Sequence, residues 1–394
     1  MEHSKRTKKA VSLETFVFLL VFGLFFGYLG AVMGVDKMFN TLMNTAHYLL
    51  VEVVFFIMAI AVLAGAVASL LSEFGVVALI NKIISPIMRP LYGLPGAASI
   101  GIVTTYLSDN PAIISLAKDK EFSKYLKNYE MPTLCNLGTA FGMGLILTTF
   151  MIGLGDGTQF MIPALIGNIG ALIGSIVSVR IMMHFTKKFY RADKHAKAES
   201  TAKTAELYRI REVREGNTFE RVLDAILEGG KSGVELGLQI IPGVVIICTL
   251  VMIFTFGPKE YIDGMPVYTG AIKEGVALFP KIGDFLSSIL KPLFGFSSAE
   301  AIAFPITSLG SVGAAMGLVK DFLAKGLIGP NDIAVFTAMG MCWSGYLSTH
   351  VGMMDALGVR KLSSKAILSH TIAGLVAGIS AHYLFVLYMM VSGA

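Results

Sequence analysis

Two short polar segments interrupt apolar stretches of the chain, and their residue types could bind a polar group or a cation. The first segment is 104–111 and the second is 307–313. They offer hydroxyls, one carboxylate, one side-chain amide and bare glycine backbone, and the candidate site residues are Thr104, Thr105, Ser108, Asp109, Asn110, Thr307, Ser308 and Ser311. Helix ends facing each other at such breaks could hold an anionic or polar group on amide protons and a cation on carbonyl oxygens. Alternatively, these residues only satisfy the backbone of their own breaks.

Polar residues also recur in the apolar stretches that follow each segment. Asn136 and Thr139 are three residues apart, while Ser344 and Ser348 lie roughly on one stripe of a helix over 333–354. We predict that these four residues belong to the same site as the two segments. Side chains of this kind also join helices in lipid, and that interpretation stays open.

Enzyme and metal-site motifs are missing from the sequence. No His-x-x-x-His or Cys-x-x-Cys spacing occurs, and His350 and Asp355 are five residues apart, which does not place them on one helical face. Residues 229–232 end like a phosphate-binding loop, but Ala225 stands where that motif needs glycine. The sequence predicts no catalytic residues, no metal site and no cofactor beyond Na⁺ or H⁺ coupling, and hence a protein that is not an enzyme.

Composition places these segments in a membrane. The chain has 394 residues, of which 54% are hydrophobic and 15% charged, against about 25% charged in soluble proteins. Stretches without Asp, Glu, Lys or Arg cover 15–35, 53–72, 90–108, 132–155, 157–179, 236–258, 301–319, 333–354 and 366–394. Each is near the roughly 20 residues that a helix needs to cross a bilayer. This distribution excludes a soluble enzyme, a nucleic-acid binder and a disordered scaffold.

Basic segments give the expected topology. Residues 1–14 carry a net charge of +2, and 186–216 carry nine basic and five acidic side chains. Such segments mark the cytoplasmic side of a membrane, so we place both there, with 186–216 as a helical linker. The apolar run 15–35 is too long for a signal-peptide core and is interpreted as a retained first span.

This placement requires a re-entrant hairpin. Five full crossings before the linker would leave it outside, together with the lysines of 118–127. A segment over 90–117 that enters and returns on one side restores the charge rule. Pro111, which lacks an amide proton and disfavours helical geometry at Asn110, marks its turn.

An internal duplication is visible at an offset of 202 residues. Shifting 90–119 onto 292–321 without a gap matches 11 of 30 positions, including Gly93 with Gly295 and Thr105 with Thr307. Each half would hold three crossings, an odd number, so the second half would lie inverted. The predicted fold is an all-α polytopic membrane protein with two inverted repeats, each with a re-entrant helical hairpin, an amphipathic helix (74–92, 276–294) and three spans, plus an extra N-terminal span. The expected domains are 1–47 (basic N-terminus and first span), 48–185 (first repeat), 186–233 (linker) and 234–394 (second repeat).

The two halves resemble membrane proteins with gate or nucleoside-recognition domains. The resemblance rests on Gly93-Leu94-Pro95-Gly96 leading to Leu107-Ser108-Asp109-Asn110-Pro111-Ala112-Ile113, and on Gly295-Phe296-Ser297-Ser298-Ala299-Glu300 leading to Gly310-Ser311-Val312-Gly313-Ala314. This group includes spore maturation proteins A and B, the membrane region of ferrous iron transporter B and, more distantly, concentrative nucleoside transporters. The first tip lacks the Cys-Asn-x-Pro-Ala pattern of the iron transporter, and the second lacks the acidic and amide residues of the nucleoside transporters.

The resemblance implies a secondary transporter of a small polar or amphipathic solute, with a nucleoside-like solute included. Transport would be coupled to a cation or proton and would alternate access around the two hairpin tips. Independently of the resemblance, Asp109 is the carboxylate at the first predicted break, and such a residue could carry a proton or help to bind Na⁺. A non-transporting scaffold or signalling protein of the gate-domain group is the alternative. The expected setting is a bacterial cytoplasmic (inner) membrane, and the expected partners are the lipid bilayer, the solute and a second copy in a homo-oligomer, with no nucleic acid.

The inverted arrangement predicts that 118–127 and 320–330 face opposite sides of the membrane. Single cysteines placed in the two loops should react with a membrane-impermeant thiol reagent from opposite sides of oriented vesicles. Labelling of both loops from the same side would contradict the inversion.

Overall fold

The protein is a helical, multi-pass membrane protein. The structure, a computed structural model, describes residues 9–190 and 211–393, without the side chains of Lys120, Glu121 and Ser348. Within these ranges six helices are long and apolar enough to cross a bilayer: Leu13–Met33, Val35–Glu73, Thr133–Gly153, Met161–Phe189, Thr218–Thr255 and Arg360–Ser392. The predicted linker lies mostly outside the described residues. Its first residues continue a helix to Phe189, and 211–217 is not helical.

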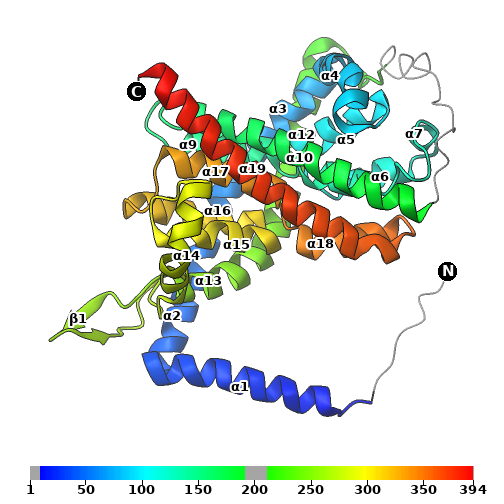
Figure 1. Cartoon of the computed structure of the whole chain (residues 1–394). Helices are drawn as coiled ribbons and strands as arrows, with labels where there is room; N and C mark the ends of the chain where they lie inside the picture. The colour runs from blue at the N-terminus through cyan, green and yellow to red at the C-terminus, as the bar shows by residue number, and fades with distance from the viewer. Residues whose placement is uncertain (1–8, 191–210, 394) are drawn as a thin grey trace.

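The first half begins with helices α1 (Leu13–Met33) and α2 (Val35–Tyr48). The next elements are a π-helical turn η1 (Leu49–Val54), α3 (Phe55–Glu73), α4 (Val76–Tyr92), the short turn η2 (Gly96–Ala98), α5 (Ser99–Leu107), α6 (Ala112–Lys118), α7 (Lys120–Ser123), α8 (Thr133–Thr139), α9 (Gly144–Gly153) and α10 (Met161–Phe189). Helix α1 stands apart from the body of the molecule (Figure 1), and most of its apolar side chains are exposed. This is the environment expected of a lipid-facing span.

The second half repeats the order of elements from α2 to α10, except that it lacks a counterpart of α7 and adds a strand hairpin and the turn η5. It comprises α12 (Thr218–Pro242), a second π-helical turn η3 (Gly243–Cys248), α13 (Thr249–Thr255), a small hairpin of β1 (Glu260–Ile262) and β2 (Met265–Val267), α14 (Leu278–Phe294), η4 (Ala299–Ile302), α15 (Ala303–Gly310), α16 (Val312–Ala324), α17 (Pro330–Cys342), α18 (Tyr346–Ala356), η5 (Arg360–Leu362) and α19 (Ser363–Ser392). Helices α4 and α14 both have 17 residues and end at left-handed glycines, Gly93 and Gly295. These glycines are 202 residues apart, the offset of the sequence repeat. That the halves are inverted stays a prediction.

Both predicted hairpins are present as helix, break and helix. The first break covers 108–111, between α5 and α6, and the second consists of Ser311, between α15 and α16. Helices α5 and α6 pack closely, because a Cβ at Gly101 would lie 2.6 Å from a methyl carbon of Ile113. The amphipathic segments occur as α4 and α14, and α14 meets the second hairpin at an angle of 77°.

The stretches 132–155 and 333–354 differ from the continuous spans expected from the sequence. The first is divided into α8 and α9 by a break at 140–143, and the second into α17 and α18 by a break at 343–345. Left-handed residues stand at the restart of each helix, Met143 with φ 55° and Gly345 with φ 66°. The breaks were missed because neither contains a charge or a proline.

Two helix packings through glycine hold the body together. Helix α3 of the first half lies against α12 of the second, where a Cβ at Gly65 would overlap the carbonyl oxygen of Gly229. Helix α10 packs against α17 and α19, with Gly174 against the backbone of Ala373. Each packing therefore joins one half of the chain to the other.

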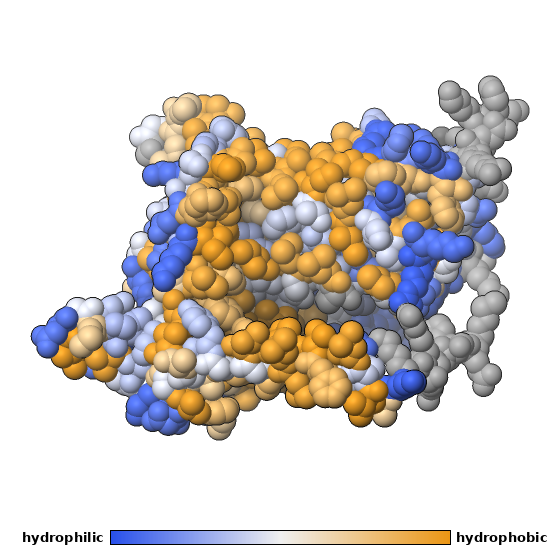
Figure 2. Space-filling view, turned by 60° about the horizontal axis from the view of Figure 1, so that its bottom comes forward, coloured by the Kyte–Doolittle hydropathy of each residue, from blue (hydrophilic) through white to orange (hydrophobic). Residues whose placement is uncertain are grey.

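Figure 2 shows hydrophobic side chains over much of the face it presents, with hydrophilic ones gathered toward its two ends.

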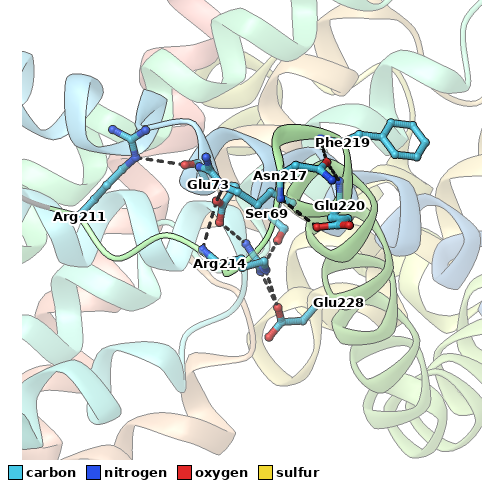
Figure 3. Close-up of polar contacts among 9 residues, drawn as sticks. Ser69, Glu73, Arg211, Arg214, Asn217, Phe219, Glu220 and Glu228 are labelled. Carbon is cyan, nitrogen blue, oxygen red and sulfur yellow. Dashed lines mark hydrogen bonds and ion pairs between the residues drawn. The ribbon is translucent and has the colours of Figure 1, made fainter.

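An ion-pair cluster fastens the end of the linker to the α3–α12 pair (Figure 3). The buried carboxylate of Glu73 accepts from the Nη1 of Arg214 at 2.7 Å and from the Nε of Arg221 at 2.6 Å. Arg214 also reaches Glu228 at 2.5 Å and Ser69 at 3.1 Å. Because a buried carboxylate is costly without partners, these contacts fix where α12 begins relative to α3.

Replacing Gly229 with Val should destabilise the protein, because the added methyl groups would force the backbones of α3 and α12 apart. We expect a loss of about 1–3 kcal/mol, the usual cost of overpacking a dense interface. The readout is the melting temperature of the purified protein in detergent.

The matched control is Gly23→Val on α1, where a Cβ meets nothing within 4 Å. It should melt close to the unmodified protein. Equal effects of the two substitutions would contradict the proposed close contact.

Candidate binding site

All four breaks meet at one cavity of about 250 Å³, which we call the tip cavity. Its lining is contributed by both hairpin tips, by both broken spans and by α12 with η3. The residues are Asp109, Asn110, Met143, Leu236, Gln239, Ile240, Gly243, Ile247, Gly310, Ser311, Val312, Gly313, Ser344, Gly345 and Thr349. Four irregular segments far apart in the sequence therefore share one place in the fold.

Asn110 of the first tip is hydrogen-bonded to the break at 343–345. Its side-chain Nδ2 donates to the carbonyl oxygen of Ser344 at 2.7 Å, and the hydroxyl of Ser344 donates back to its Oδ1 at 3.3 Å. Asn110 is only 1% exposed, and a Cβ at Gly142 would overlap its Oδ1. The first tip is thus held between the breaks of both halves.

The second tip is joined to the same break. The amide of Gly345 donates to the carbonyl oxygen of Ser308 at 3.0 Å, and the hydroxyl of Ser311 accepts from the amide of Ala314 at 3.2 Å. Ser311 thereby caps the N-terminus of α16, whose first residues, Val312 and Gly313, line the cavity. The break at 343–345 is consequently hydrogen-bonded to both hairpins.

Asp109 lies between the tip cavity and a smaller one. The smaller space, which we call the side cavity, measures about 160 Å³ and is lined by Ala61, Gly65, Leu107, Ser108, Asp109, Ile146, Ser232, Gly233, Glu235, Leu236 and Gln239. The Oδ1 of Asp109 accepts a hydrogen bond from the backbone amide of Asn110 at 2.7 Å. This is a local bond, and it leaves the second carboxylate oxygen available to a ligand or an ion.

The arrangement offers both signs of partial charge to a bound molecule. Helices α16 and α18 begin at the cavity and turn their partially positive ends toward it, while α15 and α17 end there with partially negative ends. Ile240, Ile247 and Val312 supply an apolar wall. Such a site suits a small molecule with hydrogen-bonding groups on an apolar frame. Within the described ranges, no three His, Cys, Asp or Glu side chains gather to hold a metal ion.

The predicted site residues divide into two groups. Asp109, Asn110, Ser311 and Ser344 line the tip cavity, and Ser108 lines the side cavity. Thr104, Thr105, Asn136, Thr139, Thr307 and Ser308 line neither cavity, and the side chain of Ser348 lies outside the described part. In four of these the hydroxyl bonds the preceding turn of its own helix: Thr105 to Gly101, Thr139 to Cys135, Thr307 to Ala303 and Ser308 to Pro305.

Asn136 joins helices away from the cavities. Its Nδ2 donates to the hydroxyl of Ser178 on α10 at 2.9 Å and to the carbonyl oxygen of Ala366 on α19 at 3.0 Å. The Ser178 hydroxyl also lies 2.8 Å from Nδ1 of His370. Asn136 therefore takes the helix-joining role left open by the sequence.

Sequence reasoning missed the contribution of α12. Leu236, Gln239, Gly243 and Ile247 line the tip cavity at spacings of three and four residues, which is one face of a helix. The only polar side chain among them is Gln239. A single glutamine on an otherwise apolar stripe gives too weak a signal to be selected without the structure.

Comparison with known proteins places this geometry in context. Residues 54–170 match a family model described as "Gate: Nucleoside recognition", so the predicted resemblance to gate domains is confirmed over that range. Among solved structures, a double variant of the concentrative nucleoside transporter CNTnw in an outward-facing state has a TM-score of 0.54 at 15% identity, covering 98% of this chain and 94% of that one. The chain shares that transporter's fold.

Other comparisons are weaker. A single variant of CNTnw in an intermediate state gives a TM-score of 0.49 at 14% identity, covering 95% of this chain and 85% of that one. No curated protein matches the chain.

Replacing Asn110 with Ala should destabilise the tip, because it leaves the buried carbonyl oxygen of Ser344 without its donor. We expect a loss of about 1–3 kcal/mol, the usual cost of an unsatisfied buried polar group, measured as a lower melting temperature in detergent.

Ser344→Ala should cost less, since it removes only the longer bond. The double variant should lose less than the sum of the single losses, as expected for residues in contact. Strictly additive losses would contradict the pairing.

Proposed function

We propose that the protein is a secondary transporter that binds a small, polar or amphipathic solute in the tip cavity. The observation that carries the proposal is that four breaks, two from each half of the chain, line one cavity, and that three of them contribute polar side chains to it. Irregular backbone at membrane depth is tolerated where it lines a polar cavity or is buried in protein, and transporters bind their solutes at such places. The fold shared with a concentrative nucleoside transporter supports the same assignment.

The lining favours an uncharged solute with donors and acceptors, of which a nucleoside-like molecule is one example. Gln239, Ser311 and Thr349 supply side-chain donors and acceptors, and the isoleucines of α12 and η3 supply a surface for an apolar frame. The volume of about 250 Å³ limits the solute to a small molecule.

Coupling is assigned to Asp109, the carboxylate at the first break. Ionisable groups inside a membrane protein commonly mark ion or proton pathways. Either Na⁺ or a proton bound at Asp109 would neutralise its charge as the cavity closes around the solute.

Alternating access requires one side of the cavity to move relative to another. The two hairpins and the break at 343–345 are hydrogen-bonded together, whereas α12 contributes mainly apolar contacts to the cavity. We infer that the hairpins and broken helices move as a unit along α12 and its partner α3. The proposed setting is a bacterial cytoplasmic membrane with residues 211–217 on the inner side, as the basic linker predicts.

Uptake into proteoliposomes tests the function. We expect accumulation of at least one member of a panel of radiolabelled nucleosides, nucleobases and similar small polar solutes, with a dependence on an imposed Na⁺ or proton gradient. Asp109→Asn should abolish the gradient dependence while the protein retains its melting temperature.

Asp156→Asn serves as the matched control, because this exposed carboxylate lies between α9 and α10 and lines neither cavity. Normal coupled uptake by Asp109→Asn would contradict the coupling assignment. No uptake or binding across the panel by the unmodified protein would favour a scaffold instead.

A further inference from the structure

The side cavity adjoins the tip cavity and extends it along α12. The two cavities share Asp109, Leu236 and Gln239, and the side cavity continues to Glu235 and Ser232. These α12 residues lie on adjacent turns of one helix face. A molecule at Gln239 is therefore in contact with both spaces.

Glu235 is an exposed ionisable side chain on the candidate membrane span Thr218–Thr255. In the structure its neighbours Val234 and Leu238 are exposed apolar side chains, and α12 lies there against Ala61 and Met58 of the apolar helix α3. A carboxylate at such a level faces a water-filled space or a partner. Here it faces the side cavity.

The charges that line the two cavities have one sign. Among the described residues of both linings, Asp109 and Glu235 are the ionisable ones, and no lysine or arginine is present. The remaining polar lining of the side cavity, Ser108, Ser232 and Gln239, presents oxygen atoms that can accept hydrogen bonds or contact a cation. A cleft lined by one sign of charge and walled by apolar side chains raises the local concentration of the opposite ion.

We propose that the side cavity is a cation-selective access path to the tip cavity, with Glu235 as its specificity-determining residue. It admits small cations, protonated amines and neutral polar molecules, and it repels phosphate and carboxylate groups. This goes further than the proposed function, on which it rests only in treating the tip cavity as a solute site. It excludes phosphorylated and carboxylate solutes from this route.

The test measures access of charged probes and does not require a known solute. Gln239→Cys places a thiol where the two cavities meet. The rate at which this thiol reacts is measured in the purified full-length protein with a cationic and with an anionic methanethiosulfonate reagent of similar size. Each rate is divided by the rate at which the same reagent reacts with the small neutral thiol 2-mercaptoethanol in solution, which removes differences in intrinsic reactivity. The native Cys135, Cys248 and Cys342 are buried. The reaction rate of the protein without the substitution gives their contribution, which is subtracted.

We expect the normalised rate ratio of cationic to anionic reagent to be at least about 10, the lower end of the enrichment given by charged clefts. Adding Glu235→Gln should lower this ratio several-fold, and raising the salt concentration should lower it as well. Asp224→Asn, an exposed carboxylate on the same helix that lines neither cavity, should leave it unchanged.

Three results would overturn the proposal. They are a normalised ratio near one, a ratio that Glu235→Gln does not change, and the absence of any reaction at position 239. Because the readout is thiol modification, the path can fail while uptake succeeds, and uptake can fail while the path is supported.

Discussion

The structure depends on the rule that backbone polar groups cannot stay unpaired at membrane depth. Each of the four breaks interrupts a helix and leaves amide and carbonyl groups without their usual partners. Two of these groups have partners in another segment: the carbonyl oxygen of Ser344 accepts from the side chain of Asn110, and that of Ser308, in the last turn of α15, accepts from the amide of Gly345. These bonds bring both hairpin tips to the break at 343–345, beside the tip cavity. The pairing requirement thus helps to explain both the stability of these breaks and the place of the tip cavity.

The dense packing of the rest of the molecule keeps the breaks in register. In lipid, apolar helices gain little from burying hydrophobic surface, so close backbone contact must hold them. Glycines of α3 and α12 provide that contact on one side of the molecule, and glycines of α10 provide it toward α17 and α19. The ion pairs of Glu73 set the position of α12 along α3, and α12 in turn lines both cavities. The two π-helical turns, η1 and η3, occur in this same long pair, and η3 contributes Gly243 and Ile247 to the tip cavity.

The sequence was sufficient for elements whose signal is local. A proline with adjacent polar residues marks the first break, and the 202-residue offset locates the second along with the amphipathic helix α14. The breaks at 140–143 and 343–345 were missed because they lie in charge-free stretches, where hydropathy cannot distinguish a broken helix from a continuous one. Residue type also selected Asn136 and Thr139, but their partners are on α10 and α19 or on their own helix turn, which only tertiary contacts reveal. Gln239 and Glu235 were not placed at the site because their role depends on the first hairpin tip, more than 100 residues earlier in the chain, lying beside α12.

The bond between Asn110 and Ser344 joins residues 234 positions apart. During synthesis the first hairpin is complete long before the ribosome reaches the break that accepts its amide. Until then the side-chain amide of Asn110 lacks the partner that it has in the folded protein, and burying it unpaired would cost free energy. The closing of the first hairpin tip is therefore linked to the synthesis of the second half of the chain, which supplies the acceptor.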